Sequence, residues 1–337
     1  MATPPTAGKP SPPSLIAALR GGFDAVANHV TLLIFPVALD MLLWLGPHVQ
    51  LKKAILGLLN ELGTSPAWEA TGSAEIWENN LPVLQEAANR LNLMTNLRSL
   101  PVGIPSLMSG LLPVKVPGGA PLFWDVSNPW LILGLVLLLT VFGLGAGSLY
   151  FSIVAQAALG GSPEWRKAIQ DWPRAMLQVL SLAVALLIAL LIISLPSLCI
   201  FSVIAWGGLP LGQLGIIIYL AVLLWIAFPV IFTPHGIFAY RINVLTALRK
   251  SVRLTRLTLP TTSFFILIIF MLSEGLDILW RVPAEDSWLM VLGIAGHAFI
   301  TTGLLAATFL YFRDADRWVQ IMLEKARSMQ AHAEPPG

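Results

Sequence analysis

The chain has 337 residues, of which 56% are hydrophobic and 11% are charged, with a formal net charge of +2. Soluble globular proteins carry about 25% charged residues, so this composition excludes an ordinary soluble domain. The mean hydropathy of +0.77 is typical of an integral membrane protein.

The first 13 residues are polar and rich in proline, and we interpret residues 1–13 as a disordered tail. No cleavage site of the small-x-small type follows the first apolar run. We therefore expect no cleavable signal peptide and interpret the first span as a signal anchor. The lone cysteine, Cys199, lies in an apolar run, so no internal disulfide is possible.

Six apolar stretches follow, each long enough or nearly long enough to cross a hydrocarbon core of about 30 Å at about 1.5 Å per residue. A backbone in lipid must satisfy its own hydrogen bonds, so these stretches predict helices. The predicted spans are residues 30–46, 129–159, 176–204, 211–240, 261–280 and 287–312. The fold class is therefore all-α, a polytopic membrane protein with about six transmembrane helices.

Amphipathic segments precede the first, third and fifth spans, near residues 14–30, 163–174 and 243–259. Ser14 is a candidate N-cap for the first of them. We expect these segments to be cytoplasmic interfacial helices, with apolar side chains in lipid and basic ones near headgroups. In the third, the candidate residues for binding anionic headgroups are Arg249, Lys250, Arg253 and Arg256. The three units could be an internal repeat, or the pattern could be the usual one of cytoplasmic segments that precede a span.

A long connection, residues 47–128, separates the first two spans. Apolar spacing predicts amphipathic helices over residues 51–62 and 81–91, whereas residues 101–108 are apolar but interrupted by Pro and Gly. These elements are too few for a large independent core. We expect them to rest on the outer ends of the spans or on the membrane surface, where another membrane protein could bind.

The basic residues are distributed asymmetrically, since fourteen of the twenty fall on one side of a six-span arrangement. Basic residues in short flanking loops stay cytoplasmic. We therefore predict cytoplasmic N- and C-termini, a cytoplasmic tail over residues 313–337 and an extracytoplasmic insertion over residues 47–128. The bundle of the second to sixth spans covers residues 129–312.

Four ionisable residues form a predicted polar cluster in the outer half of the bilayer: Asp40, Glu274, Asp277 and His297. We interpret them as structural, with Glu274 either protonated or bonded to His297 between helices, and with Asp277 bridging Arg281 at i, i+4. The alternative is a proton relay in a transporter. A polar cavity reaching Glu274 and His297 would favour transport, whereas a packed bundle with an apolar outer groove would favour partner binding.

Other motifs point away from catalysis. Gly143 and Gly147 form a small-xxx-small pair that predicts close helix packing rather than a nucleotide loop. The five histidines show no metal-ligand spacing, and no Gly-x-Ser-x-Gly elbow is present. We expect no enzymatic activity, no cofactor, no metal and no nucleic-acid partner, because topology and anionic lipid explain the basic face.

Two short segments carry a resemblance. Residues 247–254 (ALRKSVRL), running into an apolar span, and residues 35–47 (FPVALDMLLWLGP) resemble poorly characterised bacterial six-span proteins, which are similar to the membrane domain of some glycerophosphoryl diester phosphodiesterases. The resemblance implies the six-span plan and the bacterial cytoplasmic membrane. The soluble catalytic domain has no counterpart here, so its activity and metal site are not implied.

Together these patterns predict a non-enzymatic integral membrane protein with a structural, lipid-interacting or complex-assembly role. The expected partners are anionic lipid headgroups on the cytoplasmic side and, through residues 47–128, another membrane protein. The alternative is a small-solute or lipid transporter with its polar site near Glu274.

Overall fold

A computed structural model describes residues 12–64, 74–110, 115–206 and 212–333, and these are mostly helical, with almost no strand. Residues 1–11 of the predicted N-terminal tail lie outside the described residues. Among the described residues, five helices are long and apolar enough to cross a membrane, or six if one bent pair counts as a single span. The prediction of an all-α chain with about six possible spans is confirmed to that extent.

The bent pair lies at the N-terminus. It consists of α1 (Leu15–Asn28), a 3-10 turn η1 (Val30–Leu33) and α2 (Ile34–Leu45), with a bend of 92° between the two arms. α1 begins at its predicted cap, because the Ser14 hydroxyl accepts the Ala17 N–H at 3.3 Å. α2 has only 12 residues, which at about 1.5 Å per residue is shorter than a hydrocarbon core of about 30 Å.

The central element is α12 (Met290–Ala333), with α11 (Leu259–Trp280) antiparallel beside it and α1 along its middle. Gly22 of α1 lies directly against the backbone of Gly303 and Ala307. Glycines at both helix surfaces let the backbones approach closely. The side of α1 that carries Ala18, Gly22 and Val26 is therefore buried against protein.

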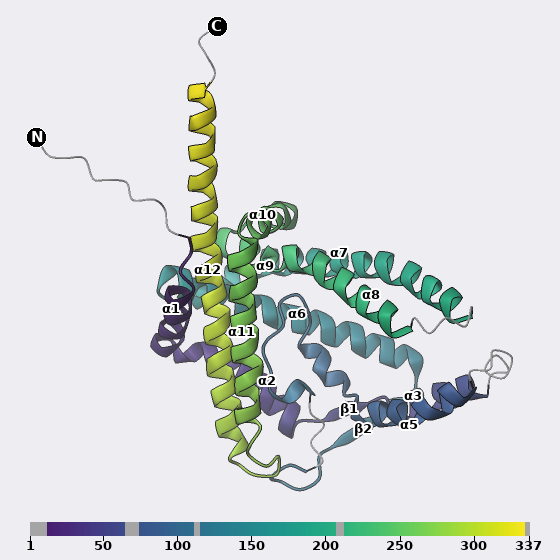
Figure 1. Ribbon diagram of the computed structural model, residues 1–337. Helices are drawn as coiled ribbons and strands as arrows, with labels where there is room; N and C mark the ends of the chain where they lie inside the picture. The colour runs from purple at the N-terminus through teal and green to yellow at the C-terminus, as the bar shows by residue number, and fades with distance from the viewer. Residues whose placement is uncertain (1–11, 65–73, 111–114, 207–211, 334–337) are drawn as a thin grey trace, which may run out of the picture.

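α12 also continues without a break beyond the predicted end of the sixth span, so the predicted tail is helical up to residue 333. This part projects past α10 (Val244–Leu257), as Figure 1 shows. We call α10 and the projecting part of α12 the basic end of the molecule.

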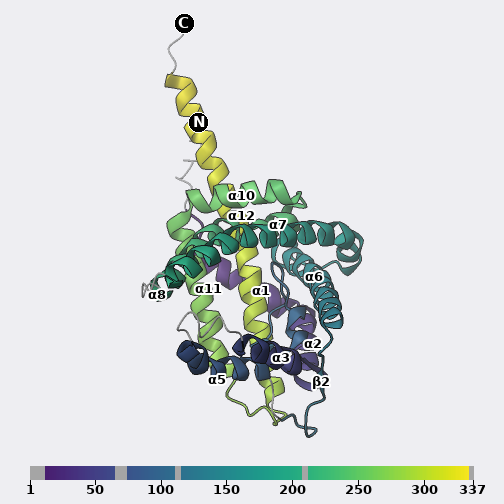
Figure 2. The same ribbon diagram turned by 90° about the vertical axis from the view of Figure 1, so that its right-hand side faces the viewer.

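A second group of helices contains α6 (Pro129–Gly160), α7 (Trp165–Trp206), α8 (Gly212–Ala227), η4 (Phe228–Val230) and α9 (Thr233–Tyr240). The predicted interfacial helix 163–174 is continuous with the third span in α7. In both views, the α7–α8 hairpin runs crosswise to the α11–α12 hairpin (Figure 1 and Figure 2). Little of this hairpin is buried, so its apolar side chains form a broad exposed surface suited to lipid.

The 47–128 insertion begins and ends at a small parallel strand pair, β1 (His48–Gln50) and β2 (Phe123–Asp125), in which His48 lies opposite Phe123. The two predicted amphipathic helices are present as α3 (Lys52–Gly63) and α5 (Ala74–Arg90), which pack on each other. These elements and the 281–289 turn lie at the lower end of Figure 1 and Figure 2, opposite the basic end. We call this the insertion end.

Candidate functional site: a polar cavity beside a buried segment of the insertion

Part of the insertion enters the helical core. Residues 93–110, which include η2 (Leu93–Leu97) and η3 (Met108–Gly110), contribute Leu97, Val102, Ile104, Leu107 and Met108 to the main buried cluster. We call residues 93–110 the buried segment. The expectation that the insertion rests on the outer ends of the spans is therefore wrong for this segment, although α3 and α5 do lie outside the core.

Two glycines of α6 make room for the buried segment. A Cβ atom at Gly143 would collide with the carbonyl oxygen of Leu97, and one at Gly147 would collide with that of Val102. The prediction that this pair packs against another transmembrane helix is wrong, because its partner is the buried segment: the short 3-10 turn η2 at Leu97 and irregular backbone at Val102. The absence of side chains at two positions one turn apart leaves a flat strip on α6 where the segment lies.

Asp40 of α2 holds the other side of the buried segment. Its carboxyl is fully buried and accepts hydrogen bonds from the Ser106 hydroxyl at 2.5 Å, the Leu107 N–H at 3.1 Å and the Met108 N–H at 3.0 Å. Irregular backbone at membrane depth is tolerated only where protein or water satisfies its polar groups. The Asp40 carboxylate accepts the N–H groups of Leu107 and Met108, so its role is to hold the buried segment in place.

Between the buried segment, α11 and α12 lies a cavity of about 400 Å³. We call it the polar cavity. Its charged or ionisable lining residues are Arg98, Glu274, Asp277, Arg281 and His297. Its hydroxyl-bearing lining residues are Ser106, Ser109, Ser273, Thr301 and Thr308. Three of the four residues of the predicted polar cluster therefore line one cavity, and the fourth, Asp40, contacts it through Ser106.

The pairing within the cluster differs from the prediction. His297 Nδ1 lies 2.7 Å from Asp277 Oδ1, and Asp277 Oδ2 lies 3.8 Å from Arg281 Nη2, as the i, i+4 spacing predicted. Glu274 is not the partner of His297, and among the described residues it makes no hydrogen bond or ion pair. Glu274 and Asp277 are one turn apart on the same face, so the α11–α12 hairpin is shifted by one turn from the register we expected.

The polar cavity is arranged for binding. The His297 side chain is 5% exposed, and its Nε2 atom has no hydrogen-bond partner among the described residues. With Nδ1 held by a carboxylate, Nε2 can accept a hydrogen bond, or donate one when the ring is protonated. No hydroxyl in the described part of the chain donates to Nε2. Nor does this part contain a group of three or more potential metal ligands.

Arg98, Ser106 and Ser109 were missed by sequence reasoning. The Arg98 Nη1 donates to the Ser109 hydroxyl at 3.0 Å, and the Ser109 N–H donates to the Ser106 hydroxyl at 3.0 Å. The available signal was the composition of residues 101–108, which are too apolar for an exposed loop and too interrupted for a helix. Such a segment is suited to the interior of a membrane protein.

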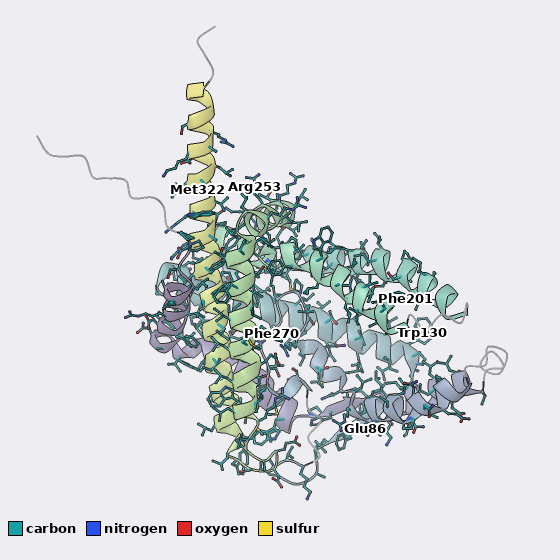
Figure 3. The ribbon with its side chains drawn as sticks, in the orientation of Figure 1. Glu86, Trp130, Phe201, Arg253, Phe270 and Met322 are labelled. Carbon is teal, nitrogen blue, oxygen red and sulfur yellow. The ribbon has the colours of Figure 1, made fainter. Side chains whose placement is uncertain are left out.

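The predicted headgroup-binding residues lie elsewhere, at the basic end. Arg249, Arg253 and Arg256 of α10 and Arg327 of α12 line a groove of about 680 Å³ together with apolar side chains such as Leu323. We call it the arginine groove. Figure 3 labels Arg253 on α10 and Met322 on the neighbouring part of α12.

Lys250 does not line the arginine groove. Its Nζ lies 2.8 Å from Asp316 Oδ2 and 4.0 Å from the centre of the Tyr240 ring. The Tyr240 hydroxyl donates to the same carboxylate oxygen at 3.0 Å. This side chain therefore joins α10 to α12, while the three arginines of α10 remain at the groove.

Comparison of the chain with protein-family models, with curated proteins and with solved structures found no match. The resemblance to the membrane domain of glycerophosphoryl diester phosphodiesterases therefore stays a prediction.

Proposed function

We propose that this chain is a non-enzymatic, multi-pass protein of the bacterial cytoplasmic membrane that binds and transports a small zwitterionic solute. The observation that carries the proposal is the polar cavity, which reaches both Glu274 and His297. Its volume of about 400 Å³ is that of a small-molecule site, for which about 300–1,000 Å³ is usual. This favours the transport alternative over the purely structural role that we first expected.

The charges of the polar cavity support the class of solute. Arg98 and Arg281 can bind an acidic group, whereas Glu274 can bind an amine. His297 Nε2 and the hydroxyls add neutral hydrogen-bonding groups. Ionisable residues at membrane depth are costly and typically line solute or proton pathways. A cavity with both signs of charge is suited to a molecule that carries both.

The proposed orientation keeps both termini in the cytoplasm and the insertion end outside, because basic residues concentrate near α10 and α12. The polar cavity would then open toward the extracytoplasmic side. Glu274 lies six residues from the end of α11, or about 9 Å along the helix. That depth is within reach of water from the insertion end.

Thiol labelling in intact cells tests this proposal. In a Cys199→Ser background, Ser273→Cys places a thiol on the cavity wall, and a charged, membrane-impermeant thiol reagent should label it from outside. The matched control is Phe270→Cys on the same helix, at a position labelled in Figure 3. Phe270 is 56% exposed and does not line the polar cavity. This thiol should stay unlabelled, because lipid surrounds it.

The solute is tested by protection and uptake. Glycine, alanine and glycine betaine are suitable zwitterionic probes, both as protectants of Ser273→Cys and as labelled solutes in proteoliposomes. We expect at least one to slow labelling and to be taken up, and Glu274→Gln to abolish the uptake. Absence of labelling at residue 273 in intact and permeabilised cells would contradict a water-filled cavity. Labelling only after permeabilisation would reverse the orientation.

A second role is proposed for the arginine groove, which supports our earlier prediction of anionic lipid binding. Each basic residue near an anionic surface contributes about 1 kcal/mol. The full-length protein in phosphatidylglycerol nanodiscs should melt at a higher temperature than in phosphatidylcholine nanodiscs. The difference should shrink with added salt and in an Arg249→Gln, Arg253→Gln double variant. An equal, salt-independent melting temperature in both lipids would count against this role.

The insertion retains the proposed partner-binding role through its outer helices. Leu58 of α3 and Val83 and Leu84 of α5 expose 55%, 67% and 38% of their surfaces. Exposed apolar groups on an amphipathic helix pair are suited to another membrane protein. Loss of a co-purifying subunit in a Leu58→Gln, Val83→Gln variant would support this role, and its unchanged recovery would argue against it.

A further inference from the structure

A second cavity, of about 350 Å³, lies away from both the polar cavity and the arginine groove. Its walls come from the end of α6, the first half of α7, α9 and the chain just after α9. We call it the α6–α7–α9 cavity. We infer that it binds the phosphate group of a small organic phosphate.

The charged residues of the wall are predominantly basic. Lys167, Arg174 and Arg241 line the cavity, and Asp171 is the single acidic residue among the lining residues. The wall therefore carries two more positive than negative charges. Such an excess attracts an anion, and guanidinium groups match the geometry of phosphate oxygens with two parallel hydrogen bonds.

The two arginines are held next to each other. Arg174 Nη2 donates to the carbonyl oxygen of Arg241 at 3.0 Å, and Arg241 Nη2 lies 2.5 Å from Asp171 Oδ2. These contacts place both guanidinium groups on the same wall of the cavity before any ligand arrives. Preorganised donors reduce the entropy lost on binding.

The backbone at Arg241 gives an independent indication. Its φ of 53° lies in the left-handed region, at the turn that ends α9. Glycine is favoured at such helix ends, and a long side chain there costs conformational energy. Residues held in unfavourable conformations occur often at binding sites. The presence of arginine instead of glycine is explained if the cavity needs its side chain.

The amide side chains of the wall also offer donors. Gln156 Oε1 accepts the Glu164 N–H at 2.8 Å, and Gln178 Oε1 accepts the Val244 N–H at 2.7 Å. A backbone N–H needs an acceptor, so these bonds distinguish the oxygen of each side-chain amide from its nitrogen. The group that each glutamine has left to offer a ligand is its NH₂. Donors therefore predominate on the wall, which favours an anion over a cation or a zwitterion.

Apart from Ser152, the remaining wall is apolar and includes Leu159, Ile237 and Phe238. An inorganic ion would leave this part unfilled, whereas the organic portion of a phosphate ester would cover it. The ester could be a soluble metabolite or a phospholipid headgroup, because α7 also carries Trp165 and Trp172, residues that favour the membrane interface. The phosphate chemistry is the same for both sources.

The test uses the full-length protein with two probes. Glycerol 3-phosphate is titrated by calorimetry into the protein in detergent, and the melting temperature is compared in phosphatidylcholine nanodiscs with and without phosphatidic acid. Saturable binding of glycerol 3-phosphate supports a soluble ligand. Stabilisation by phosphatidic acid alone supports a lipid headgroup.

The informative variants are Arg241→Gly, which also relieves the left-handed backbone, and Arg174→Gln. Each should weaken binding by about tenfold or more, since hydrogen bonds to charged groups contribute at least that factor. The matched control is Arg166→Gln, an exposed basic residue of α7 outside the cavity lining. No response of the parent protein to either probe would overturn the proposal. An equal loss of binding in all three variants would also overturn it, because it would indicate a nonspecific charge effect.

Discussion

Replacing Asp40 by leucine should release the buried segment from the core. The substitution removes the acceptor of three hydrogen bonds, and the Leu107 and Met108 N–H groups are fixed by the backbone and cannot turn to another partner. A buried donor left without a partner costs about 1–3 kcal/mol, so two of them cost about 2–6 kcal/mol. The Ser106 hydroxyl can rotate toward another acceptor, so it adds nothing to this cost.

The measurement is amide hydrogen exchange of residues 107 and 108 in detergent. Since about 1.4 kcal/mol corresponds to a factor of ten, we expect exchange to be faster by about 30-fold to about 20,000-fold in Asp40→Leu. Asp40→Asn should fall between this variant and the parent, because its amide oxygen can still accept. The control is Asp24→Asn, which breaks an exposed pair with Arg20 that contributes little. Unchanged exchange at both amides in Asp40→Leu would refute the proposed role of the carboxyl.

Asp277, Gly147 and His48 each allow a further test of the structure. Asp277→Leu should lower the free energy of unfolding by about 1–3 kcal/mol, because it leaves the buried His297 imidazole without its partner. Glu274→Leu should lower it by less. Thermal unfolding that shows the reverse order would contradict the observed pairing. Gly147→Ala should lower the free energy of unfolding by about 1–3 kcal/mol, because the added methyl group overpacks the contact with Val102. The matched control is Gly134→Ala, whose methyl group would meet no atom within 4 Å and which should be neutral or stabilising. Burial lowers the pKa of His48, so the folded state favours the neutral ring. The contribution of this group to stability should be fully present above about pH 6.5 and should decline as the pH falls below it. His48→Phe should lessen that decline. An identical pH dependence of the melting temperature in parent and variant would refute the last prediction.

The sequence predicted the long helices well, because an apolar run of the length of α6 or α11 has few alternatives. The Ser14 cap and the two helices of the insertion were also predictable, since their signals lie within a few residues of each other. These features depend on local chemistry alone. They establish the helical class of the chain and the outline of the insertion.

The site was less predictable because it depends on contacts between distant residues. Asp40 and residues 106–108 are joined across more than 60 positions, and nothing near either one indicates the other. The choice between Glu274 and Asp277 depends on the conformation of the 281–289 turn, where a shift of one helical turn changes the partner of His297. The residue types of the cluster were evident in the sequence, whereas its pairing required the three-dimensional structure.

The contact between α1 and α12 has a consequence for biosynthesis. α1 is synthesised before α12, and the residues that it packs against, Gly303 and Ala307, are made about 280 residues after it. At about 5–20 residues per second, α1 waits for some tens of seconds before its partner exists. During that time an amphipathic helix is stable at the membrane surface. We therefore expect the nascent chain to hold α1 in the interface and to bring it into the bundle only after α12 has been made.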